Sequence, residues 1–189
     1  MLAIFKREFK SYFQNVIGWL FVAALLAVYG LYFYVYNLKN GYPYISYDLK
    51  GIGFIMMIAV PILTMRSLSD EKKTKTDQLM LTLPVSVGKI VAGKYLAMAA
   101  VYTIDIALFA LSPLVLSIYG KVALSEAYVA LFGYWLYGLS CIAVGLFISS
   151  ISESVIISAI LTFAALFLSY MMQSITCLLY TSPSPRDCS

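Results

Sequence analysis

The chain has 189 residues, of which 62% are hydrophobic and 12% charged, and its mean hydropathy is +0.88. Soluble domains average roughly 45–50% apolar and about 25% charged residues, so this composition excludes a soluble domain and predicts an integral membrane protein. The net charge of +4 does not indicate nucleic-acid binding, because the basic residues flank apolar spans, where the positive-inside rule accounts for them.

The chemistry-bearing residue types are sparse. The chain has no histidine, and its three cysteines, at positions 141, 177 and 188, are scattered. Their spacing fits neither a zinc site nor a disulfide framework, and histidine is the commonest metal ligand. We therefore expect no catalytic residue, no metal and no cofactor in this chain.

Residues 2–14 are expected to form an amphipathic helix that lies in the membrane interface, with Lys6, Arg7 and Lys10 on its polar face. The alternative is a simple basic flank to the first span. That span covers about residues 16–36. The far end of the span is rich in tyrosine, which is typical of an aromatic belt, and a substrate-contacting surface is the alternative. The tyrosines are Tyr29, Tyr32, Tyr34 and Tyr36.

The second span is the least regular. Its apolar part, residues 52–65, reaches only about 21 Å at 1.5 Å per residue, which is too short to cross a membrane. Extending it to residues 47–68 requires Asp48 and Lys50 to snorkel outward and Arg66 to snorkel inward. Its backbone is loosened by Gly51, Gly53 and Pro61. Irregular backbone is tolerated in a membrane where protein covers it, so this span should face other helices.

A long polar segment from Arg66 to Lys94 separates the second span from the third. Its first half is crowded with charged residues: Arg66, Asp70, Glu71, Lys72, Lys73, Lys75 and Asp77. A short apolar run at residues 79–83 follows, then Pro84 and an expected helix cap at Ser86. A charged segment between two spans must lie in water. We interpret it as a surface on which a soluble partner acts on the membrane domain.

Three further spans are expected over about residues 90–116, 127–148 and 155–176. Pro113 is expected to kink or end the first of them. Asp105 lies near its centre, where a carboxylate costs about 2.5–3.5 kcal/mol on insertion scales, so it should point into the bundle, be protonated or pair with a hydroxyl. Two interpretations stay open: a site on the substrate path, and a structural hydrogen bond to a neighbouring helix.

One motif imitates a nucleotide site. Gly88, Gly93 and Lys94 have the spacing of a phosphate-binding loop, but Tyr95 stands where Ser or Thr must reach magnesium. An apolar helix follows, and no room remains for the sheet of a nucleotide-binding domain. We interpret these residues as the start of a membrane helix with Lys94 at the interface. Gly93 and Ala97 lie one turn apart and predict close helix packing, as do Cys141 and Gly145.

The distribution of Lys and Arg predicts the orientation. The N-terminal segment and the segment from Arg66 to Lys94 together hold nine, whereas the opposite side holds three, at Lys39, Lys50 and Lys121. The N-terminus and the long polar segment are therefore expected in the cytoplasm. Residues 177–189 do not match the rest in character and are interpreted as a non-native tail. On that interpretation the natural protein continues beyond the fifth span.

Four segments carry a resemblance to a known family: Pro61–Ser67, Asp70–Leu79, Leu83–Ser86 and Gly93–Tyr95. They resemble the permease subunits of ABC exporters of the ABC-2 class, closest to gliding-motility and nitrous-oxide-accessory permeases. In that family, charged residues lead into Gly-Thr, a further acid, leucines and Pro-Val-Ser. This chain has Lys75-Thr76 in place of Gly-Thr and Asp77 where Glu is common. The resemblance covers roughly residues 1–176, which we assign to an incomplete permease membrane domain.

The resemblance implies an all-α, polytopic transmembrane helix bundle with five membrane helices present of an expected six, an N-terminal elbow helix and a cytoplasmic coupling helix. It implies a bacterial plasma-membrane protein that pairs with a second permease subunit and with cytoplasmic ABC ATPase subunits, which supply the ATP hydrolysis. The ATPase-coupling residues that it implies are Glu71, Lys72, Thr76, Asp77, Leu79, Leu83 and Pro84. Membrane lipid is the remaining partner, and the chain by itself is expected to be no enzyme.

Two rival interpretations remain. The first is an ion-coupled secondary transporter or channel that uses Asp105 as its ion site. Inverted repeats with paired broken helices are typical of such proteins, and the sequence contains only one loosened span. The second is a membrane scaffold that transports nothing.

Overall fold

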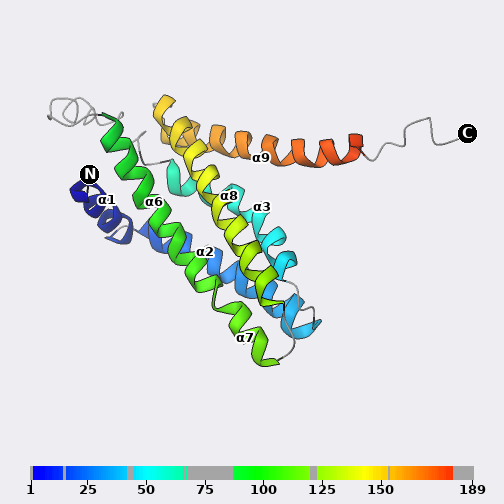
Figure 1. The fold of residues 1–189 in the computed structure, drawn as a ribbon. Coiled ribbons are helices and arrows are strands. Elements are labelled where there is room, and N and C mark those ends of the chain that lie inside the picture. The colour runs from blue at the N-terminus through cyan, green and yellow to red at the C-terminus, as the bar shows by residue number, and fades with distance from the viewer. Residues whose placement is uncertain are drawn as a thin grey trace, which may run out of the picture.

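The computed structural model describes residues 2–14, 16–41, 45–65, 67, 87–119, 123–152 and 154–180. Over these residues the chain folds into helices (Figure 1). They are α1 (Leu2–Gln14), α2 (Val16–Tyr32), the π-helix η1 (Phe33–Lys39), α3 (Ile45–Thr64), α6 (Val87–Phe109), α7 (Ser112–Tyr119), α8 (Leu124–Ile151) and α9 (Val155–Tyr180). The expected all-α helix bundle is confirmed, and the expected coupling helix lies outside the described residues.

The helices match the predicted spans closely. Among the described residues, four stretches are long and apolar enough to cross a membrane: Gly18–Lys39, Gly88–Ile118, Leu124–Ile151 and Val155–Met172. The apolar stretch Gly51–Thr64 is shorter, but α3 as a whole has 20 residues. At 1.5 Å per residue α3 is about 30 Å long, which matches the hydrocarbon thickness of a bilayer.

The irregular second span packs against protein, as predicted. Helix α3 contacts α2, α8 and α9. Along its length Ile52, Met56, Met57, Val60 and Leu63 are completely or almost completely buried. Asp48, in its first turn, is also fully buried and accepts a hydrogen bond from Asn37 Nδ2. The expectation that Asp48 snorkels outward is therefore wrong, because a polar partner from η1 meets it inside the protein.

The third predicted span is broken in two. Helix α6 ends at Phe109, two turn residues follow, and α7 begins at Ser112. Pro113 is the cause, since it has no N–H to donate to the carbonyl of Phe109 and its ring crowds that carbonyl. The break that the sequence predicted from Pro113 is confirmed.

Small residues bring the helices close together. A Cβ on Gly138 of α8 would lie 2.3 Å from Tyr102 Cζ of α6, and one on Gly145 would lie 2.6 Å from Thr64 Oγ1 of α3. Gly133, also on α8, faces open space. The Tyr102 hydroxyl donates to Tyr134 O at 2.8 Å, and Tyr134 lies one turn before Gly138 on α8. These contacts confirm the close packing predicted at Gly145.

Different helices lie at the two ends of the bundle. Helix α1 packs on α6 and α2 near the start of α6, and α6 and α8 pack side by side along the bundle (Figure 1). Helix α9 contacts α8 and α3 and then runs crosswise to α6 and α8, away from the bundle (Figure 1). The η1 segment and α7 lie at the opposite end from α1 (Figure 1). The described residues on the two sides of the polar segment, Ser67 and the start of α6, therefore lie beside α1.

Candidate functional site

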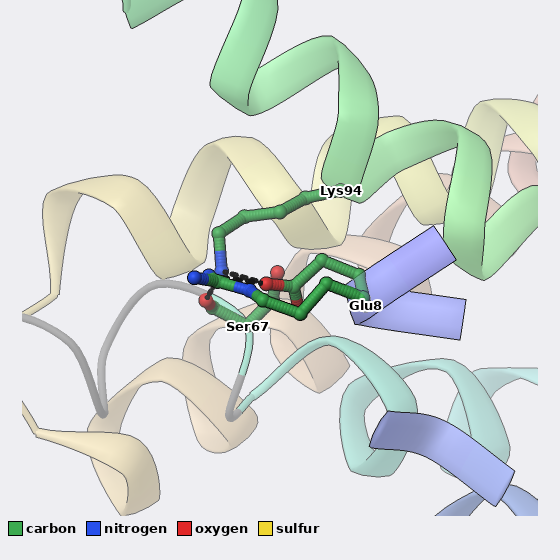
Figure 2. Close-up of polar contacts among 4 residues, drawn as sticks. Glu8, Ser67 and Lys94 are labelled. Atoms are coloured by element: carbon green, nitrogen blue, oxygen red, sulfur yellow. Dashed lines mark hydrogen bonds and ion pairs between the residues drawn. The ribbon is translucent and has the colours of Figure 1, made fainter. Parts of the chain in front are cut away.

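Three residues join the two ends of the long polar segment to α1. Ser67 forms a turn just after α3, where its backbone N–H donates to Thr64 O at 3.0 Å. Lys94 lies two turns into α6, and its Nζ donates to Ser67 O at 2.8 Å. The same Nζ lies 3.7 Å from Glu8 Oε1 of α1. Figure 2 shows the Lys94 side chain extending from α6 toward both groups. We call Glu8, Ser67 and Lys94 the loop base.

The loop base is a buried charge site. The side chain of Lys94 is 2% exposed and that of Glu8 is 15% exposed. Burying an ammonium group is costly unless it is paired and hydrogen-bonded, and here a carboxylate and a carbonyl oxygen meet both needs. Arg7 Nη2 contacts the same Glu8 oxygen at 3.0 Å, but Arg7 is mostly exposed. Arg7 is also next to Glu8 in the sequence, whereas Lys94 reaches Glu8 from another helix. The contact with Lys94 is therefore the one that requires the folded protein.

The neighbouring sequence explains why α1 comes so close to α6. Gly93 precedes Lys94, and a Cβ there would lie 3.0 Å from Ile4 Cγ2 of α1. Ile4 lies one turn before Glu8, so this close approach brings the Glu8 carboxylate to Lys94. A row of aromatic contacts runs along α1 and reaches Trp19 of α2. Ring centroids are 5.8 Å apart for Phe5–Phe9, 4.9 Å for Phe9–Phe13 and 5.4 Å for Phe13–Trp19.

Sequence reasoning missed most of this site. Lys94 was expected at the membrane interface, and the structure instead buries it inside the protein. Glu8 drew no attention, although it is the one acid in the otherwise basic segment that also holds Lys6, Arg7 and Lys10. An isolated acid in a basic segment, together with a lysine in the first turns of a membrane helix, is the sequence signal that could have indicated an ion pair.

The predicted coupling residues lie between the two anchors of the loop base. They are Glu71, Lys72, Thr76, Asp77, Leu79, Leu83 and Pro84, and all of them fall in residues 68–86, outside the described part of the chain. Their role stays a prediction. What the structure places is the pair of anchors, Ser67 before the segment and Lys94 after it.

Asp105 lies one turn before the end of α6 and is fully buried, so it points into the bundle as expected. Neither of its carboxylate oxygens has a hydrogen-bond partner among the described residues. Tyr134 of α8 is buried nearby, within electrostatic range, and its hydroxyl also has no hydrogen-bond partner there. A structural hydrogen bond from Asp105 to a neighbouring helix is therefore not observed within this part of the protein.

Comparison with known proteins identifies the family. The family described as "ABC-2 family transporter protein" matches residues 11–185, a range that includes every described helix from α2 to α9. No curated protein and no solved structure matches the chain. The chain therefore belongs to the ABC-2 transporter family, and it is a multi-pass membrane permease subunit of an ABC transporter.

Proposed function

We propose that this chain is the permease subunit of an ATP-driven ABC exporter in the bacterial plasma membrane. Residues 68–86 receive the motion of a separate cytoplasmic ATPase subunit, and a second permease subunit completes the assembly. The observation that supports this proposal best is the loop base, because both ends of the segment are tied there to α1 and α6. The family match supports the permease role itself.

The composition of the segment suits a protein partner. Charged side chains such as Lys72 and Asp77 fit the rim of an interface, and Leu79 and Leu83 fit its apolar centre. On this proposal, charge pairs set the register on the ATPase, and the leucines bind in an apolar groove. Pro84 then ends the apolar run before α6 begins.

The loop base determines which helices a displacement of residues 68–86 moves. Ser67 directly follows α3, Lys94 belongs to α6, and Glu8 belongs to α1. A displacement of residues 68–86 by the ATPase therefore acts on three helices together. Because α3 also packs against α8 and α9, the displacement reaches the rest of the bundle. The N-terminus and the loop base lie on the cytoplasmic side in this proposal, in keeping with the excess of Lys and Arg there.

Co-purification tests the proposal. The reading frames next to the gene are first searched for an ABC ATPase with a complete phosphate-binding loop. The full chain is then co-expressed with that ATPase, and a tag on the chain is used to isolate the complex from detergent-solubilised membranes. We expect the ATPase subunit to be retained and to hydrolyse ATP in the complex. The same isolation with an unrelated ABC ATPase is the control. Cargo movement by the chain with no nucleotide-hydrolysing partner would overturn the proposal and favour the ion-coupled alternative.

Asp105 is proposed to lie on the translocation path, because it is buried and its oxygens have no hydrogen-bond partner among the described residues. We expect Asp105→Asn to leave the thermal unfolding midpoint unchanged or raised, since no observed hydrogen bond is lost and a neutral amide is cheaper to bury than a carboxylate. We expect ATP hydrolysis by the complex in native membranes to fall several-fold.

The control for this variant is Glu126→Gln, which removes one carboxylate charge at an exposed position of α8. A lowered unfolding midpoint for Asp105→Asn with normal hydrolysis would assign Asp105 a structural role. Cargo transport that is driven by an ion gradient and lost in Asp105→Asn would support the ion-coupled alternative instead.

A further inference from the structure

Two irregular helical segments lie at the end of the bundle opposite the loop base (Figure 1). One is the π-helix η1, which continues α2, and the other is the break at residues 110–111 between α6 and α7. Irregular backbone of this kind often marks a hinge or a functional site. The contacts between these two segments indicate what they do together.

Tyr29 of α2 contacts both sides of the break in the third span. Its ring stacks on Phe109, the last residue of α6, with centroids 4.1 Å apart and an interplanar angle of 14°. Its hydroxyl is hydrogen-bonded to Ser112 Oγ, at the first residue of α7. Ser112 Oγ itself donates to Phe109 O at 2.7 Å, so the Tyr29 hydroxyl is the donor to Ser112. We call Tyr29, Phe109 and Ser112 the outer latch.

A second polar contact joins η1 to α3 next to the outer latch. Asn37 of η1 donates from Nδ2 to Asp48 Oδ2 in the first turn of α3, and both residues are buried. The carboxylate of Asp48 lies within electrostatic range of the Tyr29 hydroxyl. The contact therefore holds η1 and the start of α3 together, next to the helix that supplies Tyr29.

The outer latch lies one helical turn from Asp105, toward α7. Asp105, Phe109, Ser112 and Leu116 are all buried and follow one another by three or four residues, so they share the inward face of α6 and α7. Phe109 is one turn from Asp105, and Tyr29 stacks against that ring. The stacked pair therefore lies between Asp105 and the start of α7 along this buried face.

We propose that the outer latch closes this end of the permease over Asp105 and that α7 moves about the break at residues 110–111 to open it. The proposal rests on the proposed function, because it takes Asp105 as part of the translocation path. Pro113 cannot donate to Phe109 O, and Leu111 N–H bonds to Leu108 O at 3.2 Å in a tighter turn, so α7 can rotate with the loss of few backbone hydrogen bonds. One neutral hydrogen bond and one aromatic stack are weak enough to open and close reversibly.

Labelling of a reporter cysteine tests the proposal. Cys141, Cys177 and Cys188 are replaced by serine, and Leu116→Cys places a thiol on the buried face of α7. The full chain with its ATPase partner is studied in right-side-out vesicles with a membrane-impermeant maleimide. We expect Tyr29→Phe and Ser112→Ala each to raise the labelling rate about fivefold, the factor expected when one neutral hydrogen bond is lost from the closed state.

Matched controls are available in the same helices. Ser117→Ala removes a hydroxyl of α7 that donates to Leu114 O at 2.7 Å but lies on the exposed face. Tyr34→Phe removes an exposed tyrosine hydroxyl of η1. Neither control should change the labelling rate. Equal rates in the latch variants and these controls would overturn the proposal.

Two further measurements separate the possible failures. Ile118 is 81% exposed, so labelling of Ile118→Cys reports on which side of the membrane α7 lies. Labelling of Ile118→Cys only from the cytoplasmic side would refute the orientation in the proposed function, and the latch would then be tested with the reagent on that side. If Leu116→Cys does not assemble, hydrogen exchange of the α7 amides in the cysteine-containing chain gives the same comparison. Exchange that is not faster in Tyr29→Phe would refute the latch.

Discussion

Replacing Leu79 and Leu83 together with aspartate is expected to abolish the coupling of ATP hydrolysis to transport while the helix bundle remains folded. The two leucines are the proposed apolar anchors of residues 68–86 on the ATPase. A carboxylate buried in an apolar groove without a partner costs several kcal/mol, so two such changes exceed what a typical anchor contributes. The bundle should be unaffected, because the proposal places both leucines against the ATPase and not among the membrane helices.

The measurement is the amount of ATPase subunit that co-purifies with the tagged chain, together with the hydrolysis rate of the complex and its thermal unfolding midpoint. Leu124→Asp is the matched control, since it makes the same chemical change at the first residue of α8, at the end of the bundle that the proposal places on the other side of the membrane. We expect the double variant to lose the ATPase subunit and the control to retain it. Normal retention and coupling in the double variant would count decisively against the proposed role of this segment.

The helices could be predicted because length and hydropathy determine them locally. A membrane requires about 20 apolar residues for each span, so the runs of apolar sequence predict each span to within a few residues at its ends. The amphipathic pattern of residues 2–14 predicted α1, and Pro113 predicted the break after α6. Each of these features depends on a residue and its near neighbours in the sequence, and no knowledge of the packing was needed.

The polar contacts inside the bundle could not be predicted in this way. Asp48 is charged and lies near the end of a span, which by itself predicts snorkelling, yet Asn37 of η1 meets it within the protein. Tyr29 was assigned to an aromatic belt with Tyr34, but only Tyr34 is exposed, whereas Tyr29 is buried against Phe109. In each case the deciding partner comes from another helix, and the hydropathy of one segment does not reveal which helix packs against it.

Replacing Lys94 with methionine is expected to weaken the contact of α1 with α6 and the closure of the loop base. Methionine fills a similar volume but cannot donate to Ser67 O or pair with Glu8. Leaving a carbonyl and a largely buried carboxylate without this donor should cost about 1–3 kcal/mol in the free energy of unfolding. Lys89→Met is the matched control, because Lys89 is exposed on the same helix and exposed ion pairs contribute about 0–1 kcal/mol.

A double-mutant cycle then isolates the ion pair from the loss of packing. If Glu8 and Lys94 interact as the geometry indicates, Glu8→Gln should cost less in the Lys94→Met background than in the native chain, with a coupling energy of about 0.5–3 kcal/mol. Denaturant titration in detergent gives the unfolding free energies, and co-purified ATPase activity gives the functional effect. Because the loop base joins residues 68–86 to α1, we expect Lys94→Met to retain the ATPase subunit but to reduce coupling. The contact between Glu8 and Lys94 would transmit nothing to the bundle if two results were found together. These are additive effects of the two substitutions on the unfolding free energy, and unchanged coupling of ATP hydrolysis to transport.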